Sequence, residues 1–286
     1  MSFRKMLSGF QSCWEVSHGN ISSSKKALGR GAWGVVLMGQ LRVAVKQLHQ
    51  AIENPHYLEI LYREIDIMSQ LRHPNLLQFI GAVLDDPSGY PLIITEVMDT
   101  SLRKAYENKE LTPDPGCRPV ILSIMHDVAV GLNYLHCLPD PIIHRDVSSG
   151  NVLLQSIAGP NKWKAKVSDF GSANLAHKSN TRAPGAAAYS APEVLQSIKS
   201  YDSKKQTTKM DVFSYGVLLC EIIVCRFPDM DFFQDMLSQV KTIGARPRCN
   251  RYTQGILLHS LIDLCMNNDP LKRPTMNQIV EKLDAI

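Results

Sequence analysis

The sequence predicts an α+β fold in two lobes, a small antiparallel β-rich N-terminal lobe with one helix and a larger α-helical C-terminal lobe. Short runs rich in β-branched residues fill much of residues 21–97, as is typical of strands. Across residues 103–286, apolar residues recur at three- and four-residue spacing, which indicates helices. The period changes at residues 98–102, which we take as the hinge. Residues 1–20 are expected to form an N-terminal extension.

The N-terminal lobe is predicted to be a sheet with one helix. A hairpin is expected at its start, because the turn-forming pair Gly39-Gln40 separates two β-branched runs. The helix is expected at residues 57–72, where the apolar residues fall on one stripe, and Pro74 should end it. The strand candidates are residues 35–38, 41–46, 76–84 and 92–97.

The C-terminal lobe is predicted to be mostly helical. A long helix carries the apolar stripe between residues 121 and 135, and further helices are expected at residues 212–225 and 257–266. The most apolar stretch, residues 216–225, is broken by Glu221 and is too short to span a bilayer. It is therefore expected to be a buried helix, without membrane insertion.

Composition excludes several classes of protein. The formal net charge of +4 is small for 286 residues, and no Lys/Arg run is long enough for a nucleic-acid-binding or membrane-binding arm. The seven cysteines are odd in number and none lies in a C-x-x-C pair, as expected of a reduced intracellular protein. The N-terminus lacks an apolar run of signal-peptide length. We therefore expect a cytoplasmic protein that does not bind nucleic acid.

A glycine-rich turn lies just before the predicted hairpin. Its pattern is G-x-G-x-x-G-x-V, and such glycines let backbone amides approach phosphate closely. A dinucleotide-binding fingerprint would need a helix to begin at the third glycine, whereas residues 35–38 are a strand candidate. The sequence therefore predicts a nucleotide-phosphate site at Gly29, Arg30, Gly31, Ala32, Trp33, Gly34 and Val36.

The next strand presents a lysine. Because side chains alternate along a strand, Ala44 and Lys46 point to the same face. Lys46 could be an ordinary solvated strand end, but Glu64 on the following helix offers a carboxylate that would hold it at a phosphate. We expect a Lys46–Glu64 ion pair.

A polar stretch between the long helix and residues 152–154 carries the remaining candidate catalytic residues. Asp146 can orient an acceptor hydroxyl and accept its proton. Asn151 and Asp169 offer the hard oxygen ligands that Mg²⁺ prefers. Together with Lys46, these residues are the predicted catalytic set for phosphoryl transfer.

With these motifs, the chain resembles the eukaryotic protein kinase family over residues 14–286. Ala191-Pro192-Glu193 is similar to the A-P-E element, and Arg273 to the buried arginine that pairs with its glutamate. The resemblance implies a bilobal protein kinase-like fold over residues 21–286, with ATP, Mg²⁺ (or Mn²⁺) and protein substrates. It also implies adenine recognition by the residues Val36, Ala44, Thr95, Glu96, Met98 and Leu153.

Trp14-Glu15-Val16, His73-Pro74-Asn75 and Arg273-Pro274-Thr275-Met276 resemble the tyrosine-kinase and tyrosine-kinase-like branch. The sequence indicates less clearly whether the acceptor is serine/threonine or tyrosine. Ser148 stands where serine/threonine members usually carry a lysine, and Ala186 where they carry a threonine, yet Tyr189-Ser190 is closer to their form. We therefore expect a serine/threonine kinase, with a tyrosine or dual-specificity kinase as the alternative.

Two further alternatives and a regulatory hypothesis follow. A pseudokinase scaffold would not need the full catalytic set, and a small-molecule kinase generally lacks the A-P-E platform. Arg145 could pair with a phosphate on residues 172–190, placed there by an activating kinase. The hydroxyls in that segment are Ser172, Ser179, Thr181 and Tyr189, and we favour Ser179 or Thr181.

Overall fold

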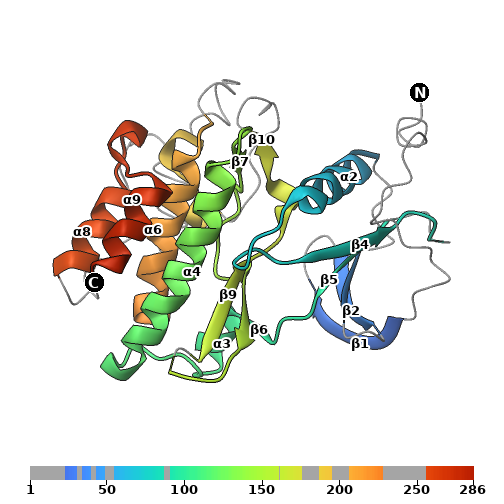
Figure 1. Cartoon of the computed structure of the whole chain (residues 1–286), viewed down its shortest axis with the longest axis horizontal. Coiled ribbons are helices and arrows are strands. Elements are labelled where there is room, and N and C mark those ends of the chain that lie inside the picture. The colour runs from blue at the N-terminus through green and yellow to red at the C-terminus, as the bar shows by residue number, and fades with distance from the viewer. Residues whose placement is uncertain are drawn as a thin grey trace. The chain divides into compact units, whose positions relative to one another are not determined.

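The computed structural model describes residues 23–30, 34–39, 43–48, 55–86, 91–160, 162–175, 187–194, 206–227 and 256–286. The chain divides into two compact units, Met1–Arg72 with Leu77–Val97, and His73–Leu76 with Met98–Ile286. The first is β-rich with one described helix and the second is mainly helical (Figure 1), so the predicted α+β fold is confirmed. The predicted N-terminal extension lies outside the described residues.

The first unit contains a five-stranded antiparallel sheet of order β1-β2-β3-β5-β4. The predicted hairpin is present, because β2 pairs with β3 in a register that places Val36 opposite Lys46. On β3, Val45 is buried in a cluster with Val83, Leu92 and Ile94. The strands are β1 (Ser23–Arg30), β2 (Gly34–Gly39), β3 (Val43–Leu48), β4 (Phe79–Val83) and β5 (Leu92–Glu96).

The predicted helix of this unit is α2 (Pro55–Gln70). Its apolar stripe is buried at Leu61, Ile65 and Met68, as the spacing predicted. The strand expected at residues 76–84 is shorter than predicted, because β4 begins only at Phe79.

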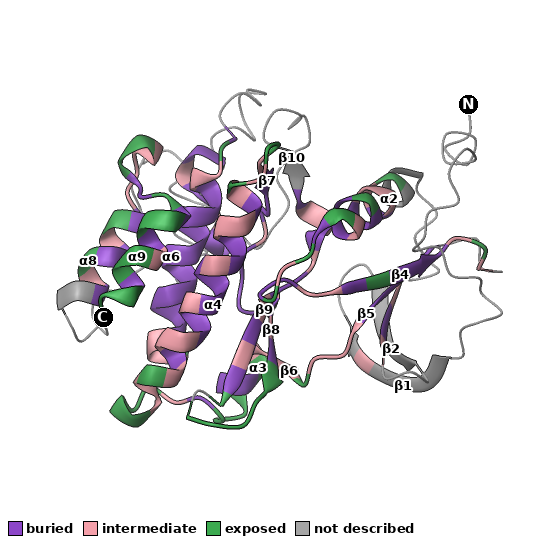
Figure 2. Ribbon diagram, in the orientation of Figure 1, coloured by how far each residue is buried: buried purple, intermediate pink, exposed green. Residues whose placement is uncertain are grey.

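The second unit is built around α6, whose residues from Met210 to Ile222 are all buried (Figure 2). This helix covers the apolar stretch that the sequence assigned to a buried helix. None of the described helices is both long and apolar enough to cross a membrane. The helices are α3 (Leu102–Glu107), α4 (Arg118–His136), α6 (Lys209–Val224), α8 (Ile256–Cys265) and α9 (Met276–Asp284).

Two small antiparallel sheets of the second unit frame the polar stretch that carries the candidate catalytic residues. One has the order β6-β8-β9 and the other pairs β10 with β7. The polar stretch runs between the end of β7 and the start of β8. The strands are β6 (Thr100–Ser101), β7 (Ile142–Ile143), β8 (Val152–Ser156), β9 (Trp163–Val167) and β10 (Asn174–Leu175).

The short segment His73–Leu76 belongs to the second unit, although it follows α2 in the sequence. Asn75 donates its side-chain amide to the carbonyl of Ala165 at 3.1 Å, and its own carbonyl accepts from the amide of Val167 at 2.9 Å. Leu76 forms a parallel bridge with Val167. These contacts explain why the strand candidate at residues 76–84 does not begin at Leu76, which bridges to Val167 of β9 instead.

Gly131 on α4 lets the helix approach this segment closely. A Cβ atom at position 131 would lie 2.8 Å from the Asn75 carbonyl oxygen, which is backbone and already bonded to Val167. We expect Gly131→Ala to lower the free energy of unfolding by roughly 1 to 2 kcal/mol, because the strain exceeds the gain in helix propensity. Urea denaturation measures this difference.

The matched control is Gly116→Ala, because a Cβ atom at that position meets nothing within 4 Å. Equal stability of the two alanine variants would show that α4 can move away from Asn75 at no cost.

Candidate active site

The first unit contains the predicted lysine–glutamate pair. Nζ of Lys46 lies 2.7 Å from Oε1 and 2.9 Å from Oε2 of Glu64. The Glu64 side chain is only 4% exposed and that of Lys46 is 22% exposed. The carboxylate therefore fixes a flexible lysine on the central strand of the sheet, with part of its side chain accessible.

The other predicted nucleotide-binding residues of this unit lie on its strands. Ala44 is buried and faces Thr95 across the β3–β5 pair. Thr95 is also buried, and its hydroxyl donates to the carbonyl of Glu96 at 3.1 Å. The strand positions near the glycine-rich turn are Gly29 and Arg30 on β1, and Gly34 and Val36 on β2. Gly31, Ala32 and Trp33 lie outside the described residues.

In the second unit, a buried carboxylate on α6 anchors the loop that holds Asp146. Asp211 accepts the backbone amides of His144 and Arg145, each at 2.8 Å, and Nε2 of His136 also lies 2.8 Å away. Burial alone would raise the pKa of Asp211, but the hydrogen bond and charge of His136, with the charge of His144 and the Arg145 amide, lower it overall. The ionised carboxylate thus holds the loop by its backbone.

Within this loop, Asn151 holds Asp146. Its side-chain nitrogen donates to the backbone carbonyl of Asp146 at 2.9 Å and to the Asp146 carboxylate oxygen Oδ2 at 2.8 Å. The amide of Asp146 donates to Nδ1 of His144 at 3.3 Å. Asp146, whose carboxylate is predicted to receive a proton, is therefore held by both its backbone and its side chain.

Ser168 joins this loop to Asp169. The Ser168 amide and hydroxyl both donate to the Asn151 carbonyl at 2.8 Å, and Nε2 of His144 lies 3.0 Å from the Ser168 carbonyl. Asp169 has a φ of 63°, and its Oδ1 accepts from the Gly171 amide at 3.4 Å. A positive φ at an aspartate is a strained conformation that is concentrated at functional sites.

The donor set of Asn151 and Asp169 fits Mg²⁺. Both hydrogen bonds of the Asn151 side chain use its nitrogen, and in the described part of the chain its oxygen Oδ1 accepts none. No cluster of three or more His, Cys, Asp or Glu residues that could hold a metal occurs among the described residues. An amide oxygen with a carboxylate suits an ion that keeps waters and binds substrate phosphates, rather than one held by a protein cage.

The remaining predicted nucleotide-binding residues, Met98 and Leu153, also belong to the second unit. Leu153 lies on β8 opposite Ser101 of β6. Both residues are partly exposed.

The structure bears on two expectations about regulation, the role of Arg145 and the choice of hydroxyl that is modified. Arg145 is buried, and its Nε donates to the carbonyl of Ser172 at 2.6 Å while its Nη1 donates to Oε1 of Gln206 at 3.1 Å. Tyr189 was counted among the hydroxyls open to modification, and this is wrong. Its side chain is buried and its hydroxyl donates to the Glu221 carboxylate at 2.6 Å, so a phosphate there would be buried against a carboxylate. Ser179 and Thr181 lie outside the described residues.

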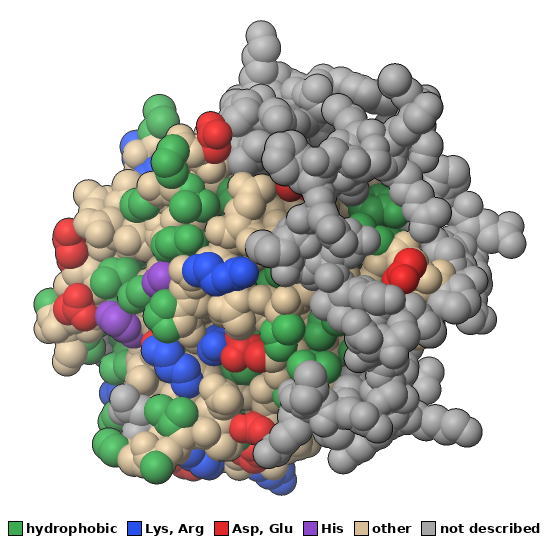
Figure 3. Space-filling model, turned by 45° about the vertical axis from the view of Figure 1, so that its right-hand side comes forward, with side chains coloured by type: hydrophobic (Ala, Val, Ile, Leu, Met, Phe, Trp, Pro, Cys, Tyr) green, Lys and Arg blue, Asp and Glu red, His purple; other side chains and the backbone are tan. Residues whose placement is uncertain are grey.

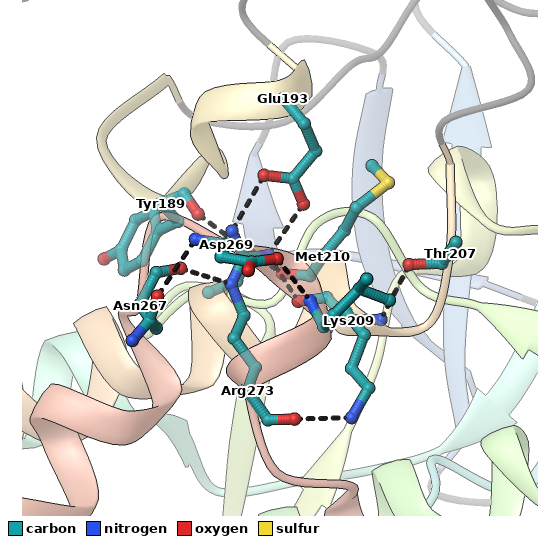
Figure 4. A network of polar contacts seen from close by, with 10 residues as sticks. Tyr189, Glu193, Thr207, Lys209, Met210, Asn267, Asp269 and Arg273 are labelled. Carbon is teal, nitrogen blue, oxygen red and sulfur yellow. Dashed lines mark hydrogen bonds and ion pairs between the residues drawn. The ribbon is translucent and has the colours of Figure 1, made fainter. Parts of the chain in front are cut away.

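The ion pair implied for Glu193 and Arg273 is present. Two parallel hydrogen bonds of 2.6 and 2.8 Å join the guanidinium to the carboxylate (Figure 4). Arg273 also donates to the carbonyls of Asn267 at 2.7 Å and Lys209 at 2.9 Å, so all three nitrogens of its guanidinium form hydrogen bonds.

Sequence reasoning assigned no role in the site to several polar residues that support it, namely Asp211, Ser168, Ser149 and Glu221. Glu221 was noted only as a break in an apolar stretch. A charged residue within an apolar stretch of a helix is a usable signal, because such a residue is buried and must find partners. No comparable signal marked Ser149 or Ser168, because serines are common in polar loops.

Comparison with known proteins adds a family. The family model described as "Protein tyrosine and serine/threonine kinase" matches residues 22–283. Two relatives from Dictyostelium discoideum, "Probable serine/threonine-protein kinase drkB" and "Probable serine/threonine-protein kinase drkA", are each 35% identical over 266 residues, or 91% of this chain. "Dual specificity protein kinase splA" from the same organism is 31% identical over 276 residues, or 90% of this chain and 11% of that protein.

The aligned regions cover 36% of drkB and 39% of drkA, so the chain spans little more than a third of these relatives. In contrast, the family model extends across both compact units and includes every residue of the predicted catalytic set. The chain therefore belongs to the protein tyrosine and serine/threonine kinase family.

Proposed function

We propose that the chain is an ATP-dependent protein kinase that transfers the γ-phosphoryl group of Mg-ATP to serine and threonine hydroxyls of protein substrates. The observation that carries this proposal is the Asp146–Asn151 arrangement. The side-chain nitrogen of Asn151 fixes the Asp146 carboxylate, and among the described residues no hydrogen bond is donated to its side-chain oxygen, which could therefore bind a cation. A residue that merely stabilised the loop would have no need for an open, hard oxygen beside a strained aspartate.

Asp146 would act on the acceptor. Its Oδ2 is held by Asn151, so the carboxylate has a fixed direction in which to orient a hydroxyl and receive its proton. General-base assistance of this kind contributes roughly 10²- to 10⁴-fold in rate.

Asn151 and Asp169 would hold Mg²⁺ (or Mn²⁺), which when bound supplies positive charge beside the phosphates of ATP. Ser168 keeps these two ligands together, because it is adjacent to Asp169 and bonds twice to the Asn151 carbonyl. Lys46, held by Glu64, would contact phosphate oxygens. The strand residues Ala44, Thr95 and Glu96, with Met98 and Leu153, would receive the adenine.

We place the enzyme in the tyrosine-kinase-like branch with serine/threonine specificity. The names of drkA and drkB support the serine/threonine specificity, and the name of splA supports dual specificity as the alternative. Phosphoamino-acid analysis separates them, as described below.

For partners, we propose protein substrates and an activating kinase that acts on residues 172–190, and no nucleic acid. The low net charge supports the last point, and on the face in Figure 3 the Lys and Arg side chains lie among Asp and Glu side chains. A cytoplasmic location is supported by the five described cysteines, all of which are free thiols.

The test is transfer of labelled phosphate from Mg-ATP to a mixture of protein substrates, followed by identification of the phosphorylated amino acid. We expect labelled phosphoserine and phosphothreonine, and no label when Mg²⁺ is chelated. Phosphotyrosine alone would overturn the acceptor class. If no label is incorporated even after treatment with an activating kinase, the chain is a scaffold rather than an enzyme.

A further inference from the structure

A buried carboxylate on α6 gathers polar side chains from three other segments of the second unit. Glu221 is fully buried, and its two oxygens accept hydrogen bonds from Tyr106 on α3, Ser149 in the catalytic loop and Tyr189 before Ala191-Pro192-Glu193, each at 2.6 Å. Arg103 on α3 completes the group, with Nη2 3.9 Å from Oε1 of Glu221. We call these five residues the Glu221 cluster.

The donors and acceptors in the Glu221 cluster fit one arrangement. Each hydroxyl has a single proton, and the three hydroxyls donate theirs to the carboxylate. Arg103 then donates Nε to the Ser149 oxygen at 3.1 Å and Nη2 to the Tyr189 oxygen at 2.9 Å. Ser149 and Tyr189 therefore each connect the guanidinium to the carboxylate. Loss of the Tyr189 hydroxyl would remove the hydrogen bond to Oε2 of Glu221, and loss of the Ser149 hydroxyl would leave Oε1 with the bond from Tyr106 alone.

Electrostatics keep the hydroxyls in their donor role. Burial, the Glu221 charge and the hydrogen bond to Glu221 all raise the pKa of Tyr189, and they raise that of Tyr106 in the same way. Burial also raises the pKa of Glu221, and the three donated hydrogen bonds oppose this. Bonds of 2.6 Å are typical of hydroxyls that donate to an ionised carboxylate.

Ser149 has a particular place in the Glu221 cluster because it lies between Asp146 and Asn151. Its carbonyl accepts the Arg103 amide at 3.0 Å, so backbone and side chain are both fixed. Tyr189 is equally fixed, because the Ser214 hydroxyl of α6 donates to its carbonyl at 2.8 Å. The loop of the proton acceptor and the segment before the A-P-E element are thus tied to one carboxylate.

We propose that Ser149 is a positioning residue for phosphoryl transfer. Through Glu221, Ser149 holds the Asp146 loop in place relative to the segment around Tyr189, where the protein acceptor would dock. The inference rests on the proposed kinase activity and assigns it a residue beyond the predicted catalytic set. The Glu221 cluster joins the Asp146 loop to the segment around Tyr189. Its disruption should therefore impair transfer to the protein acceptor and leave ATP binding unchanged.

The experiment compares Ser149→Ala and Ser149→Thr in steady-state phosphorylation of an acceptor peptide. We expect kcat/KM for the peptide to fall about tenfold in the alanine variant, equivalent to about 1.4 kcal/mol, with the KM for ATP unchanged. The threonine variant keeps the hydroxyl and should recover most of the loss. Tyr189→Phe should have a similar effect, and the double variant should lose less than the product of the two single losses.

Tyr215→Phe is the matched control. It removes another buried hydroxyl of α6, which bonds to the Met125 carbonyl at 3.1 Å and not to the catalytic loop. It should lower the melting temperature without changing peptide kinetics. The inference is overturned if folded Ser149→Ala phosphorylates peptide normally, if the threonine variant is as impaired as the alanine variant, or if the KM for ATP rises as kcat/KM for the peptide falls.

Hydrogen exchange provides a readout that does not need activity. In Ser149→Ala, the amides of residues 144–151 and 187–190 should exchange faster together, whereas Tyr215→Phe should leave both segments as in the wild type. Faster exchange in residues 144–151 alone would contradict the coupling. An inactive wild type with coupled exchange would instead overturn the proposed kinase function and leave the structural link intact.

Discussion

Asp146→Asn is expected to lower the rate of peptide phosphorylation by roughly 10²- to 10⁴-fold, the contribution of a positioned general base. Asparagine keeps an oxygen that can accept the Asn151 hydrogen bond, now 2.8 Å from Oδ2, so the loop should retain its conformation. It cannot take up the acceptor proton. Initial rates at saturating Mg-ATP and peptide measure the effect on the transfer step.

The control for this variant is Asp114→Asn, which changes an exposed aspartate that precedes a short 3₁₀ turn. Both variants should melt within a degree or two of the wild type, since neither removes a buried ion pair. If Asp146→Asn kept a rate within about threefold of the wild type, Asp146 would not be the proton acceptor.

Arg273→Ala is expected to have the largest effect on stability. The Arg273 side chain is fully buried, so its removal leaves the Glu193 carboxylate without its bidentate partner. Breaking a buried pair from one side costs roughly 3 to 5 kcal/mol. We expect the melting temperature to fall by roughly 10 °C, as measured by circular dichroism.

A double variant separates the ion pair from the packing. Arg273→Met with Glu193→Leu removes both charges and fills the space with apolar groups, and we expect it to melt above Arg273→Ala. Arg273→Lys should lie between the wild type and Arg273→Ala, because an ammonium cannot form the two parallel bonds. Lys282→Ala, an exposed change on α9, is the control. A melting temperature of Arg273→Ala equal to that of this control would contradict the assigned role of the pair.

The pattern of apolar residues in the sequence predicted two helices, one with a buried stripe and one that is buried on all sides. The helix expected at residues 57–72 is α2 (Pro55–Gln70), and that expected at residues 212–225 is α6 (Lys209–Val224). Their apolar side chains are buried at positions that lie close together in the sequence. A single short window of sequence is therefore enough to predict each helix. The strand at residues 76–84 was predicted too long, because its first residue, Leu76, bridges to Val167 of β9, which is distant in the sequence.

The sequence predicted those site residues whose side-chain chemistry allows few roles. A carboxylate such as Glu64 near Lys46 in a phosphate-binding pattern predicts an ion pair, and the pair is present. The supporting residues were not predictable, because Ser149, Ser168 and Asp211 gain their roles from partners that are distant in sequence. The buried hydroxyl of Tyr189 was misjudged for the same reason: a tyrosine in a polar segment gives no sign of a carboxylate on α6.

The placement of His73–Leu76 has a consequence for dissecting the chain. A recombinant fragment that starts at Met98 would lack Asn75, which supplies both the donor to the Ala165 carbonyl and the acceptor for the Val167 amide. It would also leave the space beside Gly131 empty. No single cut therefore yields an intact second unit, and engineers who want it alone would have to graft these four residues back, as a tethered peptide or through a circular permutation.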